Sequence, residues 1–146
     1  MIEATATALI DRPLDEVFDY LADSRNEPQW LPGAEQVEKT SEGPVGLGTT
    51  FVGTYARAGR VELTLVTFER PRAVTFRARA KIVDFDDAVE LSAEHGKTRL
   101  NARMTAQPRG LMRLLSPLMA KTLRRQFTEN WTHLKATLEE PATSRR

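Results

Sequence analysis

The chain contains no cysteine among its 146 residues. Disulfide bonds, thiolate nucleophiles and cysteine metal sites are therefore excluded, and a reducing, cytoplasmic location is expected. Nowhere do about 18 apolar residues follow one another. The start of the chain also lacks the basic and continuously apolar regions of a signal peptide. We therefore expect no stable insertion into a membrane.

An excess of charge of either sign is also lacking. The chain has 21 Lys and Arg against 20 Asp and Glu, a formal net charge of +1. This balance creates no general field that would attract nucleic acid or an anionic membrane, so no nucleic-acid partner is expected. We interpret the local basic group Lys121, Arg124 and Arg125 as the solvent-facing side of a helix rather than a phosphate site. No large exposed apolar surface can be recognised in the sequence.

Histidine is scarce as well, with two residues in the whole chain. His95 falls in a predicted hairpin turn and His133 lies near the border between the two faces of the last helix. Neither has a predicted carboxylate and nucleophile as partners. Two imidazoles without ligand spacing do not make a coordination sphere, so we expect no metal and no cofactor.

The first thirty residues predict a strand and two short helices. Residues 2–10 alternate as a strand does. Pro13 then stands at the favoured first position of a helix, with acidic residues in its first turn. A second short helix is expected to begin at Asp23 or Ser24 and to end before Trp30, because Pro32 and Gly33 require a turn there.

The middle of the chain predicts a meander of strands separated by glycine and proline turns. Consecutive antiparallel pairing is the simplest arrangement for such strands. The predicted strands are 36–40, 49–56, 61–69, 73–80, 82–94 and 98–107.

A helical hydrophobic period appears at the end of the chain. Residues 118–138 would form a helix of roughly 30 Å, which is long enough to cross a whole sheet. Residues 111–116 are expected to form a separate turn or a kinked first segment before it. The apolar arc of the helix consists of Leu123, Phe127, Trp131, Leu134 and Leu138.

A second strip on this helix mixes neutral polar side chains with flexible apolar ones. Such a strip suits the wall of a cavity, because a buried amide needs a partner that a packed aliphatic core cannot supply. The alternative is that its polar members lie at the boundary and contact water or backbone. The strip consists of Leu115, Met119, Thr122, Gln126 and Asn130.

The sequence resembles the START-like (SRPBCC) superfamily, in particular its polyketide cyclase/dehydrase-like branch, over nearly the whole chain. The resemblance lies in the order of the segments IDRPLDEVFDYLAD, NEPQWLPGAEQVE, GLGTTF, FERPRAVTFRA, KTRLNARM and LSPLMAKTLRRQFTENWTHLKATLE. It implies an α+β helix-grip fold: a curved, antiparallel, seven-stranded sheet wrapped around a long C-terminal helix, with two short helices after the first strand. Similar proteins include lipid and hormone carriers, plant pathogenesis-related allergens, aromatase/cyclases and members without an assigned activity.

The resemblance also implies a cavity between the sheet and the long helix. Small residues such as Gly53, Ala80 and Ala102 on the inner face would leave such space, or would simply let the helix sit close. Trp30 lies at the segment that resembles the rim of the family's cavity, or anchors the short helices. With the helix strip above, strand parity gives the remaining expected ligand contacts: Phe51, Tyr55, Phe76, Ala78, Phe85 and Met104.

Acid/base chemistry has weak candidates in Tyr55, Asp84, Asp86 and Asp87. Parity puts Asp87 on the opposite face from Asp84 and Asp86, so one carboxyl or another should face inward with a raised pKa. The alternative is an edge strand whose charges prevent aggregation. Arg77 is expected to face solvent and to pair with this cluster if the two strands are neighbours.

Three functions follow. The first is a protein that binds a hydrophobic or amphipathic small molecule, lipid-like or polyketide-like, in the cavity. The second is a polyketide aromatase/cyclase-like enzyme in which a cavity Tyr or Asp moves a proton. The third is a protein-interaction module. We expect one domain over residues 1–140, a disordered tail over 141–146, and a monomer or a homodimer.

Overall fold

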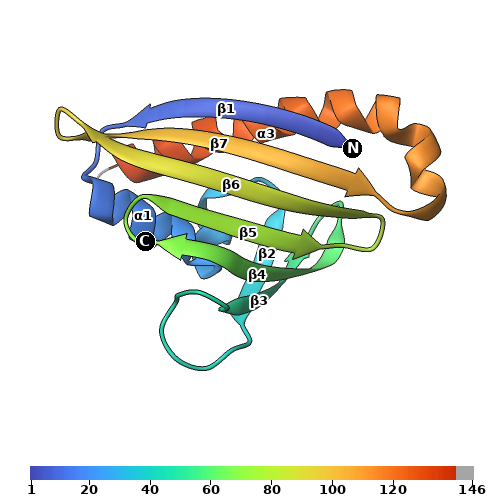
Figure 1. The fold of residues 1–146 in the computed structure, drawn as a ribbon, viewed down its shortest axis with the longest axis horizontal. Helices are drawn as coiled ribbons and strands as arrows, with labels where there is room; N and C mark the ends of the chain where they lie inside the picture. The colour runs from blue at the N-terminus through green and yellow to red at the C-terminus, as the bar shows by residue number, and fades with distance from the viewer. Residues whose placement is uncertain (141–146) are drawn as a thin grey trace.

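The computed structural model describes residues 1–140, and the predicted tail 141–146 lies outside the described residues. Seven antiparallel strands form one curved sheet in the order β1-β7-β6-β5-β4-β3-β2 (Figure 1). The consecutive pairing predicted for the meander is confirmed, and the ends of its strands differ from the prediction by at most two residues. The strands are β1 (Ile2–Ile10), β2 (Ala34–Lys39), β3 (Thr50–Tyr55), β4 (Gly59–Glu69), β5 (Ala73–Arg79), β6 (Val83–Glu94) and β7 (Lys97–Pro108).

The helices complete the expected α+β helix-grip fold. They are α1 (Leu14–Ala22), the 3-10 turn η1 (Ser24–Asn26), α2 (Glu27–Trp30), the 3-10 segment η2 (Gly110–Leu115) and α3 (Ser116–Glu139). The expectation that the second short helix ends before Trp30 is wrong. The N–H of Leu31 donates to the carbonyl of Glu27 at 2.7 Å, which closes the turn around Trp30. No helix within residues 1–140 is long and apolar enough to cross a membrane.

Alternation of apolar and polar side chains fixes the register of the sheet, because a slip of one residue would turn every side chain to the other face. β1 pairs with β7 without interruption from Ile2 opposite Ala106 to Ile10 opposite Thr98. In β4 the register shifts between Leu65 and Thr67, and such a bulge increases the local twist and bend of a strand. The sheet therefore curves around the helix, as Figure 1 shows.

The predicted apolar arc of α3 faces the sheet. Phe127, Trp131, Leu134 and Leu138 are all buried, and Leu123 is partly buried against the same core. Trp131 stacks on Trp30 of α2, with ring centroids 5.8 Å apart and planes inclined by 28°. The core therefore lies between α3 and the inner face of the sheet, and α2 supplies one of its large aromatic rings.

Basic side chains of α3 bind the outer edge of β1. The Arg124 Nε donates to the carbonyl of Glu3 and the Lys135 Nζ to the carbonyl of Leu9, each at 2.9 Å. These carbonyls belong to β1, which is an edge strand of the sheet formed by residues 1–140. Arg124 thus makes a structural contact as well as facing solvent.

Candidate functional site

The inner face of the sheet carries the side chains that strand parity predicted. Phe51 and Gly53 on β3 are buried, and Tyr55 at the end of the same strand is half-buried. On β6 the inward residues include Phe85, Asp87 and Val89. A carboxyl group therefore lies on the inner face of the sheet, where most of the neighbouring side chains are apolar.

The other two candidate aspartates point outward. Asp86 accepts two hydrogen bonds from the Arg77 guanidinium, at 3.1 and 3.2 Å, and Asp84 lies 3.5 Å from the Arg109 Nη1. The predicted pairing of Arg77 with this cluster is confirmed. The edge-strand interpretation is wrong, because β6 has β5 and β7 as neighbours. These charges therefore stabilise the outer face of an inner strand.

Asp87 is set among apolar neighbours. In the sheet register it stands opposite Phe76 on one side and Met104 on the other. Its Oδ1 is buried and has no hydrogen-bond partner among residues 1–140. Burial, together with the negative charges of Glu27 and Asp86, raises the pKa of Asp87 to about 7.

Glu27, the first residue of α2, brings a second carboxyl to the same place. Its Oε1 accepts a hydrogen bond from the Tyr55 hydroxyl. Burial raises the pKa of Glu27 to about 7, although the hydrogen bond from Tyr55 and the nearby hydroxyl of Ser24 oppose the shift. Burial and the charges of Glu27 and Asp87 in turn raise the pKa of Tyr55. We call Glu27, Tyr55 and Asp87 the interior acid cluster.

The sequence pattern pointed to Tyr55 and Asp87 but not to Glu27. A usable signal was present, because Glu27 lies three residues before Trp30 in a segment expected to be helical. Residues three apart on a helix share a face. A buried tryptophan at position 30 therefore draws the side chain at position 27 towards the interior.

Three further buried polar groups have unused hydrogen-bonding capacity, and one of them is the Ser24 hydroxyl. The indole N–H groups of Trp30 and Trp131 have no partner within the described part of the chain. Trp30 follows Glu27 by one helical turn, and Trp131 stacks on Trp30. Buried polar groups in proteins nearly always have a partner, so these N–H groups would be satisfied by a further polar group placed beside them.

Gly53 makes room for the tyrosine of the interior acid cluster. A Cβ atom at position 53 would lie 2.6 Å from Cε2 and 2.8 Å from the hydroxyl oxygen of Tyr55. The ring of Tyr55 therefore lies across the glycine, which lets the hydroxyl reach Glu27.

We expect Gly53→Ala to lower the free energy of unfolding by about 1–3 kcal/mol, because the methyl group must push the Tyr55 ring aside. Gly46→Ala is the matched control, since no described residue other than its two chain neighbours lies within 4 Å of a Cβ at position 46. Denaturant unfolding of both variants measures the difference. Equal stability would show that the Tyr55 ring does not occupy this position.

The residues predicted as ligand contacts lie at different depths. Trp30, Phe51, Phe76, Ala78 and Met104 are buried in the core. Leu115 is 43% exposed and lies at the end of η2. The role of all these predicted contacts in binding a ligand stays a prediction. The half-buried members of the set are Tyr55, Phe85, Met119, Thr122, Gln126 and Asn130.

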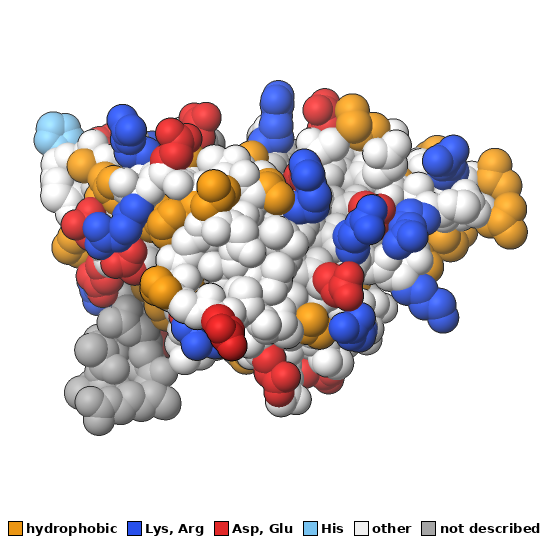
Figure 2. Space-filling model, turned by 60° about the horizontal axis from the view of Figure 1, so that its bottom comes forward, with side chains coloured by type: hydrophobic (Ala, Val, Ile, Leu, Met, Phe, Trp, Pro, Cys, Tyr) orange, Lys and Arg blue, Asp and Glu red, His pale blue; other side chains and the backbone are white. Residues whose placement is uncertain are grey.

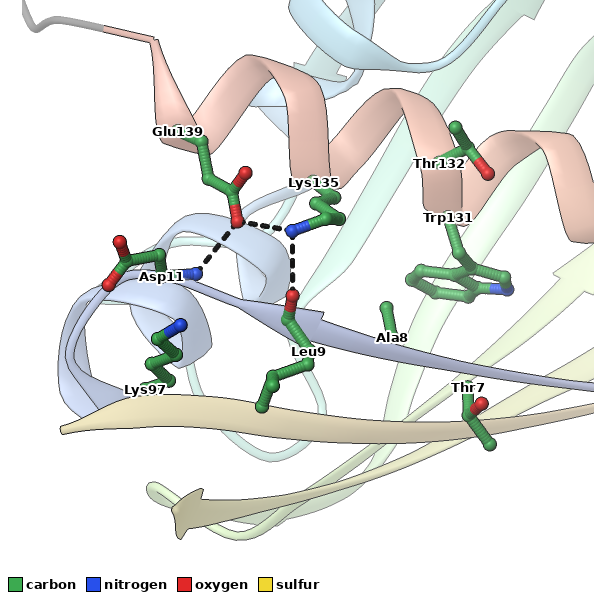
Figure 3. Close-up of a pocket in the computed structure, with 9 residues that line it drawn as sticks. All are labelled: Thr7, Ala8, Leu9, Asp11, Lys97, Trp131, Thr132, Lys135 and Glu139. Atoms are coloured by element: carbon green, nitrogen blue, oxygen red, sulfur yellow. Dashed lines mark hydrogen bonds and ion pairs between the residues drawn. The ribbon is translucent and has the colours of Figure 1, made fainter. Parts of the chain in front are cut away.

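A groove of about 510 Å³ opens between β1 and the second half of α3. Figure 3 shows that Glu139 accepts two hydrogen bonds in this groove, from the Lys135 Nζ at 2.5 Å and from the backbone N–H of Asp11 at 2.9 Å. Trp131 lines the groove and also stacks on Trp30, so it separates the groove from the interior. Charged side chains line this groove, and an apolar guest would take them out of water. The groove therefore suits a hydrophobic guest less well than the interior does.

A model of the family described as polyketide cyclase / dehydrase and lipid transport matches residues 1–139. The chain belongs to this family. Membership indicates a hydrophobic small molecule as the partner, with ligand binding or a polyketide cyclase role as the function. It also agrees with the resemblance found in the sequence. No curated protein matches the chain.

Solved structures share the fold at low sequence identity. A conserved protein from Geobacillus kaustophilus has a TM-score of 0.76 and 10% identity, covering 94% of this chain and 95% of its own. CalU16 from Micromonospora echinospora has a TM-score of 0.63 and 17% identity, covering 95% and 76%. DynU16, a protein of the dynemicin biosynthetic locus, has a TM-score of 0.70 and 16% identity, covering 95% and 48%.

Proposed function

We propose that the protein binds one hydrophobic or amphipathic small molecule between the sheet and α3, with a polar group of the ligand at the interior acid cluster. The observation that carries this proposal is the unused hydrogen-bonding capacity at the Asp87 Oδ1 and the indole N–H of Trp30 and Trp131. A buried polar atom without a partner costs about 1–3 kcal/mol. A ligand that supplies those partners would recover this free energy.

The cluster favours a neutral, oxygen-bearing ligand. With pKa values of about 7, Glu27 and Asp87 are each protonated in part of the molecules at neutral pH. A protonated carboxyl donates a hydrogen bond to a carbonyl, and an ionised one accepts from a hydroxyl. A ligand carboxylate would be repelled by the ionised form. Most of the affinity would come from buried apolar area, at about 25 cal/mol per Å².

Titration with Nile red, a neutral apolar dye, tests whether the interior takes a guest. We expect the wild type to bind the dye, with quenching of the fluorescence of Trp30 and Trp131, which are both buried. Gln126→Phe fills space at a half-buried position of α3 and should weaken binding by about tenfold.

Gln107→Phe is the matched control, because Gln107 is exposed on β7. Unfolding curves of both variants show that they are folded. Equal dye affinity in the wild type and in both variants would contradict binding in the interior. Native mass spectrometry of the purified protein would show any molecule that is retained.

A second candidate function, proton transfer on a bound ketone, is favoured by the two carboxyls with pKa values near 7. A general base works best when its pKa lies near the operating pH. The inward position of Asp87, with one oxygen that has no partner among the described residues, would let it take a proton from a carbon next to a carbonyl. A ligand oxygen that replaced Glu27 as the acceptor of the Tyr55 hydroxyl would be stabilised as an oxyanion by that hydrogen bond.

A further inference from the structure

Exposed leucines gather at the end of the molecule where β7 passes into α3. Leu111 and Leu114 of η2 are 83% and 79% exposed, and Leu118 in the first turn of α3 is 74% exposed. With Leu115 we call them the leucine end. Hydrophobic side chains project at this end of the molecule in Figure 2. The sequence predicted no large exposed apolar surface, yet these leucines are exposed within a few positions of one another. Contiguous exposed apolar side chains mark an interaction site.

The leucine end protrudes because η2 and the start of α3 extend past the end of the sheet (Figure 1). The buried residues of α3 begin only at Phe127. The neighbouring β5–β6 connection adds Ile82, 39% exposed, whose carbonyl accepts from the Arg109 N–H at 2.8 Å. The apolar surface is thus a projection rather than a hollow.

Positive charge surrounds these leucines. Between positions 109 and 125 the chain has five basic residues and no acidic one. Arg109 lies beside Asp84, and Arg124 binds the carbonyl of Glu3. Arg113, Lys121 and Arg125 are exposed and form no ion pair within residues 1–140. Lys and Arg side chains lie beside the projecting apolar ones in Figure 2.

We propose that the leucine end docks on the surface of an anionic lipid bilayer. The leucines would insert at the boundary of headgroups and acyl chains, and Arg113, Lys121 and Arg125 would meet the lipid phosphates. Charge decides between this partner and a second copy of the chain. A two-fold contact through the leucine end would bring these same cations together, whereas an anionic surface neutralises them. The proposal does not depend on the proposed function.

Cosedimentation of the full chain with vesicles tests the proposal. We expect binding to vesicles of phosphatidylcholine and phosphatidylglycerol in equal parts, little binding to phosphatidylcholine alone, and release by added salt. Arg113→Gln with Lys121→Gln should weaken binding by about fivefold for each cation removed. Leu114→Ser with Leu118→Ser should weaken it by at least about tenfold.

Two matched controls lie away from the leucine end. Leu47→Ser changes a leucine that is 72% exposed in the β2–β3 connection, and Lys97→Gln changes an exposed lysine at the start of β7. Both should bind as the wild type does. Equal binding to the two kinds of vesicle, no binding to either, or the same affinity in the leucine variant would overturn the proposal. So would sedimentation velocity that shows a dimer dissociated by the leucine variant.

Discussion

Asp87→Asn is expected to raise the free energy of unfolding at about pH 8 by about 2 kcal/mol relative to the wild type, and to leave it unchanged at about pH 4. The pKa values of Asp87 and Glu27 rise from 3.8 and 4.5 to about 7 in the folded protein. The folded state thus holds protons that the unfolded chain releases. This contribution to stability is complete below about pH 4 and is lost as the pH rises through about 7.

Between about pH 5 and pH 8, the change of stability with pH reports on Asp87 and Glu27. The carboxyls of Asp19, Asp23, Glu94 and Glu139 have lowered pKa values, so their contributions are already complete at pH 5. Each group with a raised pKa lowers stability by up to about 1.4 kcal/mol per pH unit. The wild type should therefore become less stable across this range, and Asp87→Asn should have a smaller slope.

Denaturant unfolding at several pH values measures the effect. Asp84→Asn is the control, because Asp84 is more than a third exposed and its ion pair contributes little. A wild type whose stability is constant or rises between pH 5 and pH 8 would show that Asp87 and Glu27 are not buried as described. The same outcome would remove the basis for the second candidate function.

The other large effect is expected on proton exchange at a bound ketone. If the interior acid cluster acts as a base, the protein should accelerate deuterium incorporation next to the carbonyl of 2-undecanone in heavy water. Asp87→Asn should reduce this acceleration by about 100-fold, the usual contribution of one general base. Because the base is the ionised carboxylate, the rate should rise as the pH passes through about 7.

Proton NMR follows the exchange directly, and Asp84→Asn again serves as the control since its carboxyl points away from the interior. An exchange rate equal to that in buffer would exclude this chemistry for 2-undecanone while leaving the binding of Nile red unaffected. An equal rate in Asp87→Asn would exclude Asp87 as the base. Failure of binding and failure of catalysis are thus separate results.

The sequence predicts the architecture well because its main signals are local. Alternation in the strands and the 3.6-residue period of Phe127, Trp131, Leu134 and Leu138 both survive in the structure. Turn residues divide the meander at nearly the observed positions. Each of these features depends on residues a few positions apart, so no knowledge of distant contacts is needed.

The candidate site depends on contacts between distant segments, and it was predicted only in part. Parity placed Tyr55 on an inner face and separated Asp87 from Asp84 and Asp86, but the meeting of Tyr55 and Asp87 with Glu27 depends on how α2 packs against β3 and β6. The exposure of Leu114 and Leu118 was missed for a related reason. A helical period shows which residues share a face, but it does not show where the sheet ends beneath the helix.

The pairing of β1 with β7 has a consequence for how the protein folds. Ile2 lies opposite Ala106, so the sheet cannot be completed until the last strand has been synthesised. A nascent chain would carry β1 with its pairing edge open while β2 to β6 assemble as a meander. Contacts of such large sequence separation slow folding, and an open edge invites pairing with other chains. We therefore expect newly made protein to be most prone to aggregation just before β7 leaves the ribosome.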